Sequence, residues 1–534
     1  MELKSRFSKL KLAGLDSPFL VLIPCFFVFC IFAFLGYCSF PVSDDFIMAQ
    51  DTRKGFFWAI QYWLGFWFAG WFILALELSI PLVFDFWDYG LFFFIFIYLW
   101  LFSACFFLIK SFARRNNISL ICSVVFVTFY ILYNASPAET IYWNISALAY
   151  TGSLCLMMHC MAVFILVDRN FNTKKIKKDI YIISCFLFTL ILYFIIEVKN
   201  FKSLINILDT IFNYDFLYFF WILLVLFILA LIHISKRYYY SSFLLMFIII
   251  FFASGFMPHI NYFLLTFFAI YFIYNYSKSN KISFLSIFSL FLVVLFTIIM
   301  LLMPGIRNRV GLTNPNAVKD FQFVLNGIIY MFQNQFIYNY NFLSYLFIFV
   351  FSSFCSYRFF GIQLALKSSS KIFFIVFINI FIFSIVYYYG TNGHFPSRLI
   401  SNFVAIYLLL FLFWGIFQPI KIDLPFQQVF VILICCIVFL ISPNLNSALD
   451  DILKRNALGF RQYKLSQYSD IKNCKSDTCE VEYKNFKLQN IPDQEFIFPN
   501  ESGFVLSHKL FISRYFGKEF IRYNPETLPP ELRK

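Results

Sequence analysis

Long apolar runs alternate with short polar segments along almost the whole chain. Runs of about 17 to 25 residues with few charges are long enough to cross a bilayer as an α-helix. The pattern therefore predicts an all-α polytopic membrane protein with about thirteen transmembrane helices, within a range of about eleven to fourteen. The predicted spans are 19–40, 90–109, 118–134, 145–167, 180–197, 214–233, 241–256, 260–276, 282–303, 342–357, 371–389, 399–417 and 426–442.

The basic residues test this assignment, because short cytoplasmic loops are enriched in Lys and Arg. With the amino terminus in the cytoplasm, the predicted cytoplasmic segments hold twenty Lys and Arg, and the opposite loops before residue 443 hold eight. The asymmetry supports this orientation and places the carboxyl terminus outside. The predicted outer-face loops are 41–89, 135–144, 304–341 and 390–398.

Two apolar segments do not fit as plain spans. A helix across Trp58–Leu78 would move the basic cluster at 110–115 to the outside, so we expect that segment to lie along the outer interface. Its tryptophans suit the headgroup region, where amphipathic rings are favoured. The segment 321–340 mixes amides with aromatic residues and predicts a re-entrant or interfacial helix shielded from lipid by protein.

From Pro443 onward, charges become frequent and apolar runs shorten. The chain thus divides into a transmembrane domain, 1–442, and a small soluble domain of α/β or α+β type, 443–534, outside the membrane. Cys474 and Cys479 lie within that domain, and an oxidising compartment favours a local disulfide between them.

The composition agrees with this division and excludes several classes of protein. Hydrophobic residues make up 61% of the chain, charged residues only 13%, and there are 82 Phe, which excludes a soluble globular protein. The net charge of +14 follows from the basic cytoplasmic loops and does not indicate nucleic-acid binding.

Acidic residues stand out at the predicted outer face. Asp44 and Asp45 follow the first span directly, and Glu139 follows the third. A carboxylate at a partly desolvated boundary can act as a general base on a hydroxyl within hydrogen-bond reach. The alternative for the aspartates is to cap the next helix or to end the first one in water, and for Glu139 to be a solvated loop acid.

Basic residues in the outer loops fit an anionic ligand. Arg307 and Arg309 follow a Pro-Gly pair, and Arg398 follows Gly-His-Phe-Pro-Ser, which includes His394. Planar guanidinium groups orient phosphate through bidentate bonds, although these arginines could equally meet lipid headgroups. No phosphate-binding glycine loop, Ser-His-Asp set or HExxH motif stands out, and the cysteines show no metal-ligand spacing.

Five segments in order along the chain resemble the GT-C class of integral-membrane glycosyltransferases. They are SDDF at 43–46, ETIYWNISALAY at 139–150, PGIRNR at 304–309, FPSRL at 395–399 and SRYFGKEFI at 513–521. The chain is most similar to bacterial Gtr-type enzymes, including serotype-converting O-antigen glucosyltransferases. It departs from the related chains at Phe66, where they often carry an arginine after the glycine.

The resemblance implies an inverting sugar transfer from a polyprenyl (undecaprenyl) phosphate donor to a hydroxyl of a lipid-linked O-antigen or other surface glycan. Asp44 or Asp45 would be the catalytic base, and Arg307, Arg309 and Arg398 would bind the donor phosphate. The residues implied to contact sugar or acceptor are Glu139, Tyr142, Trp143, Tyr150 and His394, although a plain loop role is the alternative for His394. The implied location is the bacterial inner membrane with a periplasmic carboxyl-terminal domain.

Several alternatives stay open. An O-antigen polymerase or ligase acting on lipid pyrophosphates also has many helices and outer-face arginines, but would not need the double aspartate. A flippase or transporter would carry charges inside its helices, which are nearly absent here. No cofactor is required, and Asp44 and Asp45 leave a Mg²⁺ or Mn²⁺ site open. The sugar and the acceptor are not encoded in any readable motif.

Overall fold

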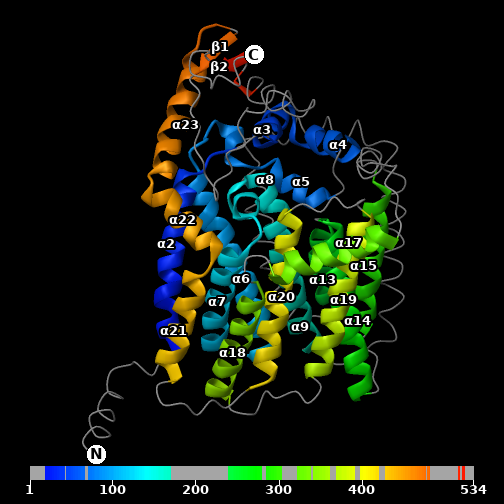
Figure 1. Ribbon diagram of the computed structural model, residues 1–534. Helices are drawn as coiled ribbons and strands as arrows, with labels where there is room; N and C mark the ends of the chain where they lie inside the picture. Colours follow the sequence, from blue (N-terminus) through cyan, green and yellow to red (C-terminus); the bar gives the residue numbers. More distant parts are fainter. Residues whose placement is uncertain are drawn as a thin grey trace, which may run out of the picture. The chain divides into compact units, whose positions relative to one another are not determined.

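The computed structural model describes most of the chain as helices and two short strands (Figure 1). The described residues are 18–41, 44–66, 70–169, 239–255, 257–279, 284–303, 321–337, 341–360, 369–390, 397–419, 427–476, 478–481, 515–516 and 520–523. The chain forms two compact units that alternate along the sequence. Unit 1 is Met1–Ser43, Trp87–His159 and Val310–Lys534, and unit 2 is Asp44–Phe86 and Cys160–Arg309.

Unit 1 contains most of the long apolar helices. Its elements are η1 (Pro18–Val21), α2 (Leu22–Cys38), α6 (Gly90–Ala113), α7 (Asn116–Tyr133), η3 (Ala138–Tyr142), α8 (Asn144–Ala147), η4 (Leu148–Gly152), the start of α9 (Ser153–Arg169), α17 (Phe321–Phe332), η7 (Gln333–Ile337), α18 (Asn341–Phe360), α19 (Ser369–Gly390), α20 (Ser397–Phe417), α21 (Gln427–Leu440), α22 (Pro443–Leu453), α23 (Asn456–Asn473), β1 (Thr478–Val481) and β2 (Phe520–Tyr523).

Small residues allow two of these helix pairs to approach closely. At Gly415 on α20, an added Cβ would collide with Ser352 and with the backbone of α18. Ser353 and Ser356 of α18 donate hydrogen bonds to the carbonyls of Gln418 and Ile416, at 2.5 and 2.7 Å. Small side chains and serine bonds of this kind hold helices together in lipid, where burial of apolar surface gives no driving force.

The crossing of α2 and α6 is equally tight. A Cβ on Gly90 would meet the backbone oxygens of Gly36 and Ser39, and a Cβ on Gly36 would lie 2.7 Å from Cβ of Phe94. Ser39 ends α2 by donating its hydroxyl to the carbonyl of Gly36 at 2.8 Å. The amino end of α6 is thus fixed against the carboxyl end of α2.

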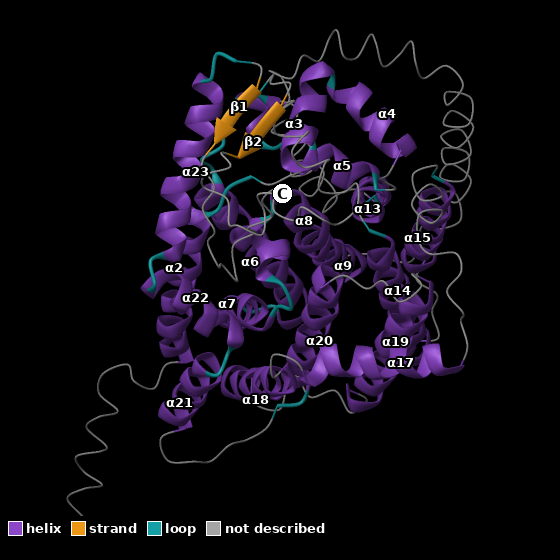
Figure 2. Cartoon of the chain, turned by 45° about the horizontal axis from the view of Figure 1, so that its top comes forward, coloured by secondary structure: helices purple, strands orange, loops and turns teal. Residues whose placement is uncertain are grey.

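After α21 the chain turns into the predicted carboxyl-terminal region. Ser442 caps α22 by accepting the amide of Leu445, and Pro443 occupies the first turn, where a missing N–H costs nothing. Beyond α23, the strands β1 and β2 pair in parallel with Thr478 opposite Phe520 (Figure 2). Cys474 and Cys479 are joined by the expected disulfide. Since this region packs within unit 1, the domain boundary at 443 stays a prediction.

Unit 2 combines short helices with apolar ones. Its described elements are α3 (Asp44–Lys54), α4 (Phe56–Phe66), α5 (Trp71–Glu77), η2 (Pro81–Phe84), the end of α9, α13 (Tyr239–Ser254), α14 (Pro258–Ser279) and α15 (Phe284–Leu302). The α5 helix docks on α13, where the amide of Phe72 donates to the carbonyl of Gly255 at 3.0 Å and Trp71 covers that glycine.

Six helices in the described part of the chain are long and apolar enough to cross a membrane, or up to eight if two bent pairs are counted as spans. These six are Gly90–Ala113, Asn116–Tyr133, Asn144–Asp168, Leu285–Leu302, Ser369–Tyr388 and Ser397–Phe417. The molecule is therefore an all-α membrane protein in its main part. Helices occur at eleven of the thirteen predicted spans, and 180–197 and 214–233 lie outside the described residues.

The two segments set apart from the predicted spans are short or bent. The stretch 56–77 consists of α4 and α5, and a helix of 11 residues rises only about 16 Å, about half the hydrocarbon core. The segment 322–337 meets the next helix at a bend of 51°, the geometry of a broken span or a re-entrant loop. The placement of both segments relative to the membrane stays a prediction.

Candidate functional site

The backbone of unit 1 is irregular between α7 and α9. Helix α7 ends at Tyr133, and the side-chain oxygen of the following residue, Asn134, accepts the amide of Ser136 at 2.9 Å in a local turn. Pro137 follows, and its ring disfavours helical geometry at the preceding residue. The chain then passes through the π-helical turns η3 and η4, which flank the short helix α8. Single π-helical turns often occur at functional sites.

A buried polar network stabilises this break. Asn134 donates to the hydroxyl of Thr140 at 2.5 Å and accepts a hydrogen bond from Ser401 of α20. Thr151 donates to the carbonyl of Thr140 at 2.6 Å, and Asn444 of α22 donates to the carbonyl of Asn134 at 2.8 Å. Polar groups inside a membrane protein are costly unless they are bonded, so these contacts explain how the backbone leaves the helix here.

Glu139 projects from η3 toward the start of α20. The hydroxyl of Ser397 donates to its Oε2 at 2.6 Å, and Glu139 is partly exposed. Within the described part of the chain no cation lies at ion-pair distance from this carboxylate. Glu139 is thus a positioned carboxylate that retains capacity to accept a hydrogen bond from a ligand.

Arg398, the next residue on α20, lies against two aromatic rings. Its guanidinium carbon is 5.3 Å from the ring centroid of Trp143 and 5.5 Å from that of Tyr150. Both rings are almost fully buried, and the arginine is partly exposed. Cation–π contacts hold a guanidinium plane in place while leaving its N–H edge able to bind an anion. We call Glu139, Trp143, Tyr150, Ser397 and Arg398 the Glu139–Arg398 site.

Tyr142 is placed differently from its neighbours. Its hydroxyl donates to the carbonyl of Phe32 on α2 at 2.8 Å, and its ring stacks on Phe94 of α6 with centroids 5.8 Å apart. The side chain is fully buried by these helices. In this arrangement Tyr142 anchors η3 to the helix bundle, while its predicted contact with sugar or acceptor stays a prediction.

Asp44 and Asp45 belong to unit 2, in the first turn of α3. Asp45 is fully buried and Asp44 is partly exposed. Negative charges in a first turn are stabilised by the helix dipole, so a helix-starting role and a catalytic role are both compatible with their position. Arg307, Arg309 and His394, the other predicted site residues, lie outside the described residues.

Unit 2 also contains a polar cluster that sequence reasoning missed. Asp51 accepts hydrogen bonds from Lys54 at 2.6 Å and from the indole of Trp63 at 3.1 Å, and it is buried. Arg53 donates to the carbonyls of Val83 and Leu82 and pairs with Asp85 at 2.9 Å. The spacing of Asp51 and Lys54 on one helix was the available signal. The Arg53 contacts join α3 to the turn at η2, and the bond between Asp51 and Trp63 joins α3 to α4.

The other residue missed was Ser397, which lies next to the predicted Arg398 and orients Glu139. Across the described ranges, no group of three or more His, Cys, Asp or Glu side chains has a geometry that would hold a metal ion. The described part of the site is therefore one oriented carboxylate, one ring-supported guanidinium and the break that carries them. No family model, curated protein or solved structure matches this chain.

Proposed function

We propose that this protein is an inverting glycosyltransferase of the membrane. It transfers glucose or another hexose from a polyprenyl (undecaprenyl) phosphate donor to a hydroxyl of a surface glycan such as lipid-linked O-antigen. The observation that carries the proposal is the Glu139–Arg398 site, which combines a carboxylate, a guanidinium and two aromatic rings at the end of apolar helices.

Arg398 supports a phosphate-linked donor. A guanidinium held over Trp143 and Tyr150 keeps its planar N–H edge in a fixed orientation, which suits the tetrahedral oxygens of a phosphodiester. Charge accumulates on that phosphate as the bond to the sugar breaks. A fixed positive group then stabilises the transition state more than the ground state, which is the requirement for catalysis.

Carboxylates supply the remaining chemistry. Asp44 or Asp45 takes the proton of the acceptor hydroxyl, and the oxygen attacks the anomeric carbon from the face opposite the phosphate. The new C–O bond forms as the bond to the phosphate oxygen breaks, and the lipid phosphate leaves with the electron pair. Phosphate needs no proton to depart, so a second acid is free for binding. Glu139, oriented by Ser397, accepts a hydroxyl of the sugar or acceptor.

Arg307 and Arg309 enter the proposal from their sequence context alone, as further donor-phosphate ligands beside Arg398. His394 enters in the same way as a sugar or acceptor contact. A divalent metal at Asp44 and Asp45 is an open part of the proposal, because carboxylate pairs bind Mg²⁺ and Mn²⁺.

The finer architecture is proposed with the function. We infer a GT-C-like arrangement of about thirteen spans in the bacterial inner membrane, with the amino terminus cytoplasmic and residues 443–534 periplasmic. The disulfide between Cys474 and Cys479 supports this orientation, since disulfides persist in the periplasm and not in the cytosol.

A transfer assay tests the function. Purified protein in lipid nanodiscs is given radiolabelled hexose on undecaprenyl phosphate together with a lipid-linked glycan, and Asp44→Asn and Asp45→Asn are compared with wild type. We expect transfer by wild type and a loss of about a hundredfold or more in whichever variant lacks the base. Asp450→Asn is the matched control, since Asp450 forms an exposed pair with Lys454.

The other outcomes separate the alternatives. Full activity in both aspartate variants would remove the carboxylate mechanism. If wild type transfers no sugar from any phosphate-linked donor but extends glycans from lipid pyrophosphates, the protein is a polymerase or ligase. Movement of the donor across the bilayer without transfer would identify a flippase.

A further inference from the structure

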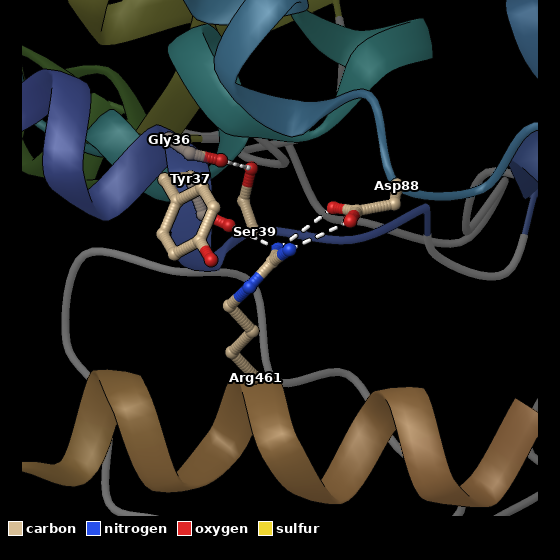
Figure 3. Close-up of polar contacts among 5 residues, drawn as sticks. All are labelled: Gly36, Tyr37, Ser39, Asp88 and Arg461. Carbon is tan, nitrogen blue, oxygen red and sulfur yellow. Dashed lines mark hydrogen bonds and ion pairs between the residues drawn. The ribbon is translucent and has the colours of Figure 1, made fainter.

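One side chain of helix α23, that of Arg461, contacts two separate segments of unit 1. Arg461 donates from Nη1 to Asp88 Oδ1 at 2.7 Å and from Nη2 to Asp88 Oδ2 at 2.6 Å, while Nη1 also donates to the carbonyl of Tyr37 at 2.6 Å (Figure 3). Its guanidinium carbon lies 3.7 Å from the ring centroid of Tyr37. Arg461 is only 7% exposed, so these contacts lie in the packed interior of unit 1.

The electrostatics favour the ion pair between Arg461 and Asp88. Burial opposes the charge on Arg461, but hydrogen bonding to Asp88 and the attraction of its carboxylate outweigh this and raise the pKa of the arginine. The carbonyl of Tyr37 belongs to the last turn of α2, where carbonyls lack helical partners. Arg461 therefore satisfies an orphan carbonyl and a carboxylate together, through charge-assisted bonds of the bidentate type.

Other residues of α23 hold the same two segments. The hydroxyl of Tyr468 donates to the carbonyl of Pro41 at 3.2 Å, and its ring packs edge-on against Phe40. The ammonium of Lys472 lies 5.0 Å from the ring centroid of Trp87. Arg461 and Tyr468 thus contact residues 37–41, and Arg461 and Lys472 contact residues 87–88.

These two segments flank a stretch of the chain that belongs to unit 2. Unit 1 is left at Ser43 and re-entered at Trp87, and the segment between them carries Asp44 and Asp45. Pro41 precedes Asp44 by three positions. The guanidinium of Arg461 therefore connects the segment where the chain leaves unit 1 with the segment where it returns to unit 1.

We propose that Arg461 is a positioning residue, which fixes both attachment points of the 44–86 segment and thereby the placement of the aspartates. The catalytic part of this inference rests on the proposed function, whereas the clamp itself does not. Joining the two ends of a segment restricts the conformations that it can adopt, and catalysis slows steeply when catalytic groups are less precisely placed.

Hydrogen exchange of the full-length protein in nanodiscs tests the clamp. The variants are Arg461→Lys, which keeps the charge but loses the planar fork, Asp88→Asn and the double variant. We expect exchange about tenfold faster in peptides covering 37–41 and 86–89, the size of effect produced by losing a charge-assisted hydrogen bond. The double variant should resemble either single one, because each change disrupts the bidentate pair between Arg461 and Asp88.

The control is Arg455→Lys, which changes an exposed arginine at the start of the same helix. Unchanged exchange in both single variants, or full additivity in the double variant, would overturn the clamp. If Arg461→Lys gives no folded protein, Asp88→Asn decides, since it retains the arginine.

The transfer assay then tests positioning. We expect kcat of Arg461→Lys to fall about tenfold while KM for the donor is unchanged, because the bound ground state does not require the aspartates in place. Faster exchange with wild-type kcat would show a clamp without a positioning role. Absence of transfer in wild type would refute the proposed function and the positioning role, and leave the exchange result to decide the clamp.

Discussion

The hydroxyl of Ser397 donates to Glu139 Oε2 at 2.6 Å, although 258 positions of sequence separate the two residues. The bond joins the start of α20 to the π-helical turn η3. It orients a carboxylate beside Arg398, whose guanidinium rests on Trp143 and Tyr150. The site is thus assembled from two helical segments that meet only in the folded chain.

Removing the charge of Glu139 should impair transfer without unfolding the protein. Glu139→Gln keeps the shape and an oxygen that can accept from Ser397, but loses the charge-assisted bond to a substrate hydroxyl. We expect kcat/KM to fall about tenfold to a hundredfold, the range for hydrogen bonds to charged groups. Steady-state transfer rates measure this. Ser397→Ala should cost less, about tenfold or below, because the carboxylate survives it. Wild-type rates in Glu139→Gln would remove Glu139 from the site.

Replacing Arg398 by lysine should weaken donor binding although the charge is kept. An ammonium provides a point charge and cannot present the planar fork that rests on Trp143 and Tyr150. We expect the KM for the polyprenyl-phosphate donor to rise about tenfold. Arg114→Lys, at an exposed arginine after α6, is the comparison. Equal KM values in the two variants would argue against donor binding by Arg398.

Hydropathy predicted the loop at 135–144 between α7 and α9, but not the π-helical turns on either side of α8. The residues of 145–152 are apolar or small, so the sequence pattern continues as a span, while the structure places α8 and η4 there. The cause is the bonding of Asn134 and Thr140 to partners such as Ser401, 267 positions from Asn134. No local pattern encodes contacts of that range.

The candidate site shows the same limit. Glu139 and Arg398 could be chosen from the sequence, because each is an isolated charge at the end of an apolar run. Their common placement depends on Ser397, which was not among the predicted site residues, and on Trp143 and Tyr150, which were expected to contact sugar or acceptor and not to support Arg398. The alternation of two units along the chain was likewise not predicted, because Asp44 and Asp45 at the first boundary were interpreted as a loop after the first span.

Two glycines of similar chemistry should respond in opposite ways to alanine. At Gly90 a methyl group would collide with backbone oxygens of Gly36 and Ser39, whereas at Gly65 in α4 it would meet nothing within 4 Å. We expect Gly90→Ala to destabilise by about 1–3 kcal/mol, as overpacking does. Gly65→Ala should be neutral or stabilising by up to about 1 kcal/mol. Thermal unfolding in detergent compares them. Similar melting temperatures for both variants would contradict the tight crossing of α2 and α6.

The disulfide between Cys474 and Cys479 provides a test of orientation. In sealed, right-side-out membrane vesicles, a membrane-impermeant maleimide should leave both cysteines unlabelled until a reductant is added, after which both should react. The reason is that only a periplasmic segment is both oxidised and accessible from outside. Cys474→Ser with Cys479→Ser is the control for labelling elsewhere, and should lower stability by only about 2 kcal/mol because the bond closes a short loop. Labelling that requires opened vesicles would place the carboxyl-terminal region in the cytoplasm and reverse the proposed topology.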